Sequence, residues 1–208
     1  MWSAIVSSII TGLFSIAVII IQSKRKEKRE DSYKGSEMAK YSVLYTELLN
    51  TLQEGLENTG SSRILIVKVH NCNERPMVGS HLYTTVVSQA FNPPARSIRS
   101  WEQEDIDAHY AKFLNPLTRD GLALLNPKDF PDGHPIKYTY ERSKIEYTKA
   151  LYLTGHESSY CFIAFSFKKG KNAQQDAMFE LQRHAKRIVK QMIKIEKKNF
   201  PKEKRRFA

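Results

Sequence analysis

Cysteine is scarce in this sequence, which holds only Cys72 and Cys161 among 208 residues. Small secreted domains that rely on disulfides in place of a large core carry a much higher density of cysteine, so that class is disfavoured. Both cysteines lie in or beside apolar segments, where a reduced and buried thiol is the common state. We therefore predict no structural disulfide. An apolar content of 41% is enough for one ordinary globular domain.

Motifs for metal binding and phosphate binding are also missing. None of the six histidines forms an H-x-x-x-H or H-E-x-x-H pair; they are His70, His81, His109, His134, His156 and His184. His70 and Cys72 stand two residues apart, but no second close pair completes a tetrahedral site. The segment KKGKN, residues 168–172, is a lysine-rich turn and not a phosphate-binding loop. We expect no metal site and no enzymatic activity, and the sequence points to no particular cofactor.

Charged residues are absent from the first 23 positions, MWSAIVSSIITGLFSIAVIIIQS. A helix of that length reaches about 35 Å, which matches the hydrocarbon core of a bilayer. Five basic residues follow between Lys24 and Arg29, whereas a cleaved signal peptide carries its basic segment in front of the apolar one. The positive-inside rule places the N-terminus outside and the remainder in the cytoplasm. We predict a transmembrane signal anchor over residues 1–23, in a bacterial inner membrane or a phage-encoded equivalent.

The positive charge, +11 overall, is concentrated at two flanks of a nearly neutral body. Residues 24–35 form a basic juxtamembrane linker, and residues 168–206 carry 14 Lys or Arg against 4 Asp or Glu. Basic side chains near a membrane are attracted to anionic lipids by about 1 kcal/mol each. The same charges suit nucleic acid, while residues 199–208 also suit a solubilising basic tail. The candidate lipid or nucleic-acid contacts are Lys24, Arg25, Lys26, Lys28, Arg29, Lys197, Lys198, Lys202, Lys204, Arg205 and Arg206.

Periodic patterns between the flanks predict an α+β domain over residues 36–198. Leucines at helical spacing indicate a helix over residues 41–56, and a long amphipathic helix spans about residues 173–198. The segment RILIVKVH, residues 63–70, has only Lys68 polar inside it and predicts a strand covered on both faces. The other expected elements are strands over 82–91, 145–154 and 160–167, a helical section over 100–125 with Glu102, Glu104 and Asp105 in its first turn, and a loop over 126–135.

The order of these elements resembles that of GAF and PAS-type sensor domains. The resemblance depends on the leading helix before RILIVKVHN and on the hairpin YTKALYLTGHESSYCFIAFSF that leads into the last helix. The order of elements by itself indicates an antiparallel sheet with helices packed largely on one face and with long flanking N- and C-terminal helices. The resemblance implies a ligand between the sheet and an insert of helices and loops, and a homodimer through the first and last helices. No residue motif for a cyclic nucleotide, haem or bilin is present, so the resemblance assigns no ligand.

The end of the first strand is the candidate ligand site. His70 and Asn71 lie where a buried strand is expected to reach a loop, and such positions carry polar ligand groups in many folds. The candidate residues for a small anionic ligand or a partner's carboxylate are His70, Asn71, Arg75, Ser80, His81, Tyr83, Arg96 and Arg99. The alternative is that His70 and Asn71 only end the strand and satisfy backbone groups of the loop.

Three functional interpretations stay open. The favoured one is a non-enzymatic, single-pass membrane protein whose cytoplasmic GAF-like domain senses a small ligand or scaffolds a partner. The second is a membrane-tethered nucleic-acid-binding protein that uses the basic last helix and tail, although only Phe179, Phe200 and Phe207 are available there to stack on bases. The third is a hydrolase built around residues 70–81. No kinase, cyclase or helix-turn-helix module fits after residue 167, so we expect no attached output enzyme.

Overall fold

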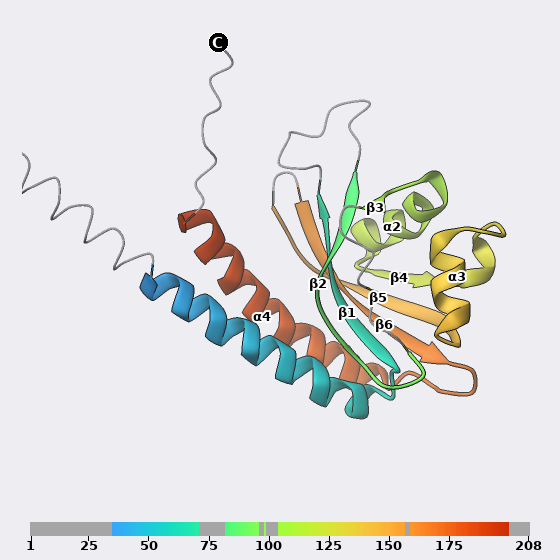
Figure 1. The fold of residues 1–208 in the computed structure, drawn as a ribbon, viewed down its shortest axis with the longest axis horizontal. Coiled ribbons are helices and arrows are strands. Elements are labelled where there is room, and N and C mark those ends of the chain that lie inside the picture. The colour runs from blue at the N-terminus through green and yellow to red at the C-terminus, as the bar shows by residue number, and fades with distance from the viewer. Residues whose placement is uncertain (1–34, 71–81, 96–97, 99–103, 157–158, 200–208) are drawn as a thin grey trace, which may run out of the picture. The chain divides into compact units, whose positions relative to one another are not determined.

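The structure is a computed structural model in which residues 35–70, 82–95, 98, 104–156 and 159–199 are described (Figure 1). The chain divides into a larger unit, Leu44–Ile193, and a smaller unit that contains Met1–Val43 and Lys194–Ala208. The elements in chain order are a helix over residues 35–59, β1 (Arg63–His70), β2 (Tyr83–Phe91), β3 (Glu104–Asp105), α2 (Ala108–Asp120), β4 (Leu122–Leu125), the 3-10 helix η1 (Pro127–Asp129), α3 (Pro135–Arg142), β5 (Ile145–His156), β6 (Ser159–Lys168) and α4 (Gln175–Asn199).

The strands form one antiparallel sheet in the order β3-β2-β1-β6-β5-β4. β1 lies in the middle, and its last residue, His70, is in register with Tyr83 on β2 and with Ser159 on β6. Every residue of β1 except Lys68 and His70 is buried. The predicted α+β class, the antiparallel sheet and the doubly covered first strand are therefore confirmed.

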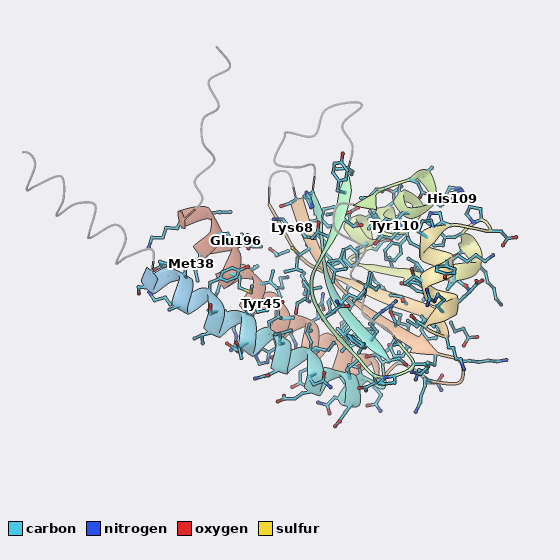
Figure 2. The ribbon with its side chains drawn as sticks, in the orientation of Figure 1. Met38, Tyr45, Lys68, His109, Tyr110 and Glu196 are labelled. Carbon is cyan, nitrogen blue, oxygen red and sulfur yellow. The ribbon has the colours of Figure 1, made fainter. Side chains whose placement is uncertain are left out.

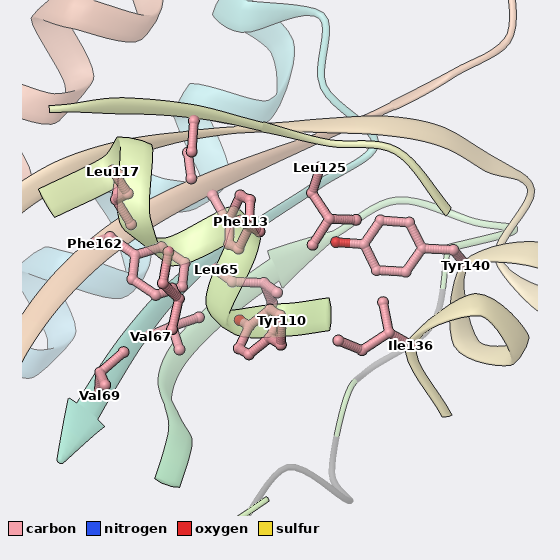
Figure 3. Close-up of a cluster of buried hydrophobic side chains, with 14 of the residues drawn as sticks. Leu65, Val67, Val69, Tyr110, Phe113, Leu117, Leu125, Ile136, Tyr140 and Phe162 are labelled. Atoms are coloured by element: carbon pink, nitrogen blue, oxygen red, sulfur yellow. The ribbon is translucent and has the colours of Figure 1, made fainter. Parts of the chain in front are cut away.

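One face of the sheet packs against α2 and α3. Side chains alternate across a strand, so Leu65, Val67 and Val69 share this face of β1. The cluster around them also contains Ile98, Tyr110, Phe113, Leu114, Leu117, Ala123, Leu125, Phe130, Ile136, Tyr140, Ile145, Ala150, Phe162 and Ala164 (Figure 3). Phe113 and Phe162 meet edge to face, with ring centroids 6.0 Å apart. This face is filled by aromatic and aliphatic side chains from α2, α3 and the strands.

The opposite face is covered within the larger unit by residues 44–59 and the first part of α4 (Figure 1). Gly55 marks the point where these elements meet β1, because a Cβ there would collide with Leu181 Cδ2 and lie 3.3 Å from Ile64 Cδ1. Leu52 and Leu56, which lie one turn apart on the same side of this helix, are fully buried. Helices thus cover both faces of the sheet, and not largely one face as the order of elements indicated.

The segment between β2 and β5 differs most from its prediction. Glu104 and Asp105 form strand β3, so the expected place of these acidic residues in a helical first turn is wrong. α2 begins at Ala108 after Asp107, a strong N-cap residue, and ends at Asp120 before Gly121, whose φ of 76° favours glycine. Residues 122–125 then form the edge strand β4, paired with β5, and are not helical.

The expected loop over residues 126–135 is more ordered than its composition indicates. It contains η1, which begins at Pro127, and it ends where α3 begins at Pro135. Proline suits both positions, because its fixed φ is helical and its missing N–H is not needed in a first turn. Prolines that the pattern assigned to a loop therefore start two short helices.

The smaller unit is described over residues 35–43 and 194–199. Tyr41 Oη donates a hydrogen bond to Glu196 Oε1 at 2.9 Å. The buried Glu37 lies 3.2 Å from Lys40 Nζ and 3.8 Å from Lys198 Nζ. These contacts join the two helical segments of this unit.

The predicted anchor over residues 1–23, the basic linker through residue 34 and the tail from residue 200 lie outside the described residues. Within the residues that are described, none of the helices combines the length and the apolar character that a membrane span requires.

Candidate functional site

The predicted ligand site is described at two of its residues, His70 and Tyr83. They are cross-strand partners at the end of β1 and β2, and their ring centroids lie 6.2 Å apart. The structure thus brings these two predicted residues together. The remaining candidates lie outside the described residues; they are Asn71, Arg75, Ser80, His81, Arg96 and Arg99.

His70 lies on the face of β1 opposite to the α2 and α3 cluster. It alternates with Val69, which belongs to that cluster, and it shares its own face with Lys68. His70 Nε2 lies 2.9 Å from the Thr85 hydroxyl. Burial lowers the pKa of His70, and the nearby charge of Lys68 lowers it further. A half-buried imidazole, an ammonium group and a hydroxyl therefore converge at this end of the sheet.

A second polar junction links the starts of α2 and α3. Asp107 Oδ1 accepts the backbone N–H of Tyr110 at 2.7 Å, and Asp107 Oδ2 lies 2.8 Å from His134 Nε2. His134 is itself the N-cap of α3, because its Nδ1 accepts the N–H of Ile136 at 3.1 Å. The Nδ1 acceptor role places the imidazole proton on Nε2, which donates to the carboxylate.

The pKa of Asp107 reflects this junction. Desolvation alone raises it, but the hydrogen bonds from Tyr110 and His134 and the nearby histidines outweigh that effect and lower it. His109, which Figure 2 labels, is the second of these histidines. Its ring centroid lies 6.5 Å from that of His134. The arrangement fixes the relative position of two helix starts, so its chemistry is that of a structural clamp.

A buried cation lies at the other end of β1. The Arg63 side chain is fully buried, and its guanidinium carbon stands 5.3 Å from the ring centroid of Tyr140 on α3. Burial lowers the pKa of Arg63, although Tyr140 acts in the opposite direction. The pair ties the first strand to α3 through a cation–π contact.

A shallow hollow of about 60 Å³ lies beside the edge strand β4. Its lining residues are Leu122, Lys149, Leu151, Gln175, Met178 and Phe179. Leu122 and Phe179 are each 46% exposed, so this is an open apolar depression and not an enclosed ligand cavity.

Groups that could bind a metal or react as a thiol were sought in the described ranges. No group of three His, Cys, Asp or Glu side chains there is placed to hold a metal ion. Cys161 on β6 is a free, buried thiol, and Cys72 lies outside the described residues. Of the basic residues predicted to contact lipid or nucleic acid, Lys197 and Lys198 are described, at the end of α4, where both are exposed.

Sequence reasoning missed several of these residues. Lys68 had a visible signal, because it interrupts an otherwise apolar strand interior, but it was not included among the ligand candidates. The pairing of Asp107 with His134 had none, since 27 positions separate them. Arg63 stands at the first position of β1, where an arginine is ordinarily exposed.

Comparison with known proteins shows the fold. No family model and no curated protein matches this sequence. Among solved structures, a far-red cyanobacteriochrome photoreceptor aligns at 11% identity over 84% of this chain and 98% of that chain, with a TM-score of 0.51.

Two further neighbours are GAF domains by name. One belongs to a two-component sensor histidine kinase of Bacillus halodurans, with 10% identity, 73% and 95% coverage and a TM-score of 0.49. The other is the PixJ GAF domain of Thermosynechococcus elongatus, with 10% identity, 79% and 90% coverage and a TM-score of 0.48. The described residues of this chain have an α+β fold similar to that of the photoreceptor, and identities this low show the fold alone.

Proposed function

We propose that this chain is a non-enzymatic, single-pass membrane protein whose cytoplasmic GAF-like domain senses a ligand or scaffolds a partner. The observation that carries the sensing part is the fold, an antiparallel sheet flanked by helices that is similar to the fold of a photoreceptor. The observation behind the anchor is the uncharged segment over residues 1–23, followed by five basic residues.

Topology and ligand binding are tested on the full chain. A protease added to spheroplasts should leave a C-terminal tag intact, because the proposal places that end inside; cleavage from outside would refute the orientation. For sensing, the purified protein is screened by thermal shift in detergent. A ligand at the end of β1 should lose its stabilising effect in the His70→Ala variant while the melting temperature without ligand changes little. His109→Ala, an exposed histidine of α2, is the matched control.

Self-association belongs to the same proposal. Leu49 is 36% exposed and Val43 is 68% exposed on the helix over residues 35–59, and exposed apolar side chains on a helix favour a partner helix. A second copy in the same membrane gains effective concentration, which assists pairing through the first and last helices. Sedimentation of the full chain as a monomer in detergent, together with no cross-linking in membranes, would contradict the homodimer.

The second candidate function is nucleic-acid binding by α4. Arg183, Arg187 and Lys190 follow one another at helical spacing and are all exposed. Phosphate contacts of this kind weaken steeply as salt concentration rises. Fluorescence anisotropy with labelled single-stranded DNA separates the candidates, since affinity without a salt dependence, or no affinity at low salt, would exclude this function.

A further inference from the structure

Lys68 occupies an unusual place for a lysine. It lies on β1, a central strand of the sheet (Figure 2). Its register partners are Thr85 on β2 and Cys161 on β6. The two residues that precede it on the same face, Ile64 and Ile66, are buried and apolar. The face therefore changes from apolar to polar halfway along the strand, and Lys68 stands half-buried at that boundary.

The ammonium group of Lys68 also has no counter-charge among the residues that the structure describes. Its Nζ forms no hydrogen bond or ion pair with the part of the chain that the structure describes. On β3, which is two strand spacings or about 10 Å from β1, Glu104 is in register with Thr84 and Asp105 with Tyr83. A half-buried cation of this kind gains more from an anionic ligand than a fully hydrated lysine does.

The groups around Lys68 are donors of the kind that oxyanions accept. His70 follows it on the same face, and its Nε2 lies 2.9 Å from Thr85 Oγ1. The two register partners of His70, Tyr83 and Ser159, are both half-buried and each adds a hydroxyl. One lysine, one histidine and three hydroxyl-bearing residues thus occupy neighbouring register positions on three adjacent strands.

We propose that Lys68, His70 and Thr85 form a binding site for a phosphate group. A tetrahedral phosphate offers several acceptor oxygens to donors that converge from different strands, and charge-assisted hydrogen bonds to Lys68 and His70 are the strong ones. The same chemistry is present in a soluble phosphorylated metabolite and in a lipid headgroup. This proposal rests on the proposed sensing function and names its ligand class.

The site lies on the face of β1 that turns away from the α2 and α3 cluster. Its position on the sheet face that residues 44–59 and the first part of α4 cover within the larger unit makes it separate from a ligand held between the sheet and the insert of helices. Ligand binding on either face leaves the other available, so the two can be tested independently.

Titration calorimetry of the full chain in detergent with inorganic phosphate tests the site. We expect saturable binding that weakens about tenfold or more in Lys68→Gln, since a charge-assisted hydrogen bond is lost. Lys149→Gln is the matched control, because Lys149 is also a half-buried lysine, on β5, and it should bind phosphate as the wild type does. A melting temperature within a few degrees of wild type in both variants shows that folding is retained.

Two results would overturn the proposal: absence of saturable binding up to about 10 mM phosphate, or equal affinities in the wild type and Lys68→Gln. Neither result contradicts the proposed sensing function. That function is still supported if the thermal-shift screen finds a ligand that stabilises wild type and Lys68→Gln equally. Vesicles separate the two sources of phosphate. Binding to phosphatidic acid vesicles that requires Lys68 and is competed by inorganic phosphate indicates a lipid headgroup, whereas binding of soluble phosphate alone indicates a metabolite.

Discussion

Replacing Asp107 with alanine should destabilise the larger unit by about 1.5 kcal/mol. The substitution removes the N-cap hydrogen bond that Tyr110 N–H donates to Asp107 at 2.7 Å, and caps of this type contribute about 1 kcal/mol. It also removes the contact with His134 Nε2 at 2.8 Å. Because the Asp107 side chain is 43% exposed, that contact contributes only about 0.5 kcal/mol.

Urea unfolding followed by circular dichroism measures this loss. With a slope of about 2 kcal/mol per molar urea, the midpoint should fall by about 0.7 M in Asp107→Ala. Asp107→Asn keeps a good cap and loses only the charge, so its midpoint should fall by about 0.2 M. A double-mutant cycle with His134→Ala then isolates the coupling of the two caps.

The pH dependence gives an independent check. The folded-state pKa of Asp107 lies below its ordinary value of 3.8, so the stabilisation is present above that value and is lost as the pH falls through the lowered pKa. The difference between wild type and Asp107→Asn should therefore persist at pH 5 and above, and vanish in strong acid. Equal midpoints for Asp107→Ala and Asp107→Asn at neutral pH would refute the assignment of Asp107 as a cap.

Three further predictions concern the sheet and its helices. Burial and Lys68 lower the pKa of His70 below 6.5, so protonation of His70 destabilises the folded state. The melting temperature of His70→Asn relative to wild type should therefore rise as the pH falls from 7 toward 5. A difference that stays constant with pH would contradict this. Leu117→Ala should cost about 3 kcal/mol in urea unfolding, since Leu117 is fully buried, and a cost under about 1 kcal/mol would show that the helix packs loosely. Gly121→Ala should cost about 1 kcal/mol because Gly121 has a φ of 76°, whereas Gly35→Ala, in a helix with open space around it, should be neutral or stabilising.

Local pattern was sufficient for the long elements. RILIVKVH forms a strand: six of its eight residues are buried, and its apolar residues do not recur at helical spacing. The nearly continuous apolar run also predicts burial on both faces of the strand. The helix over residues 35–59 and α4 each carry apolar side chains at helical spacing, and both were predicted to within a few residues at most boundaries. The order of these elements was enough to predict the α+β class and the antiparallel sheet.

The short elements needed the tertiary structure. The local sequence LALL, residues 122–125, is compatible with both a helix and a strand, and hydrogen bonding to β5 makes it a strand. Glu104 and Asp105 are in a strand because β2 lies beside them, whatever the helix dipole would favour in isolation. In both cases a partner distant in sequence supplied the hydrogen bonds that decided between two local conformations.

The candidate site divides in the same way. The sequence alone placed His70 at the end of a buried strand and Tyr83 at the start of the next, and their pairing bears this out. It did not indicate which face His70 occupies, that Lys68 and Thr85 flank it, or that Asp107 meets His134. The alternation of side chains along one strand is a local property of the sequence. The register between strands and the contacts between helix starts depend on where the whole chain folds back, and only the tertiary structure contains that information.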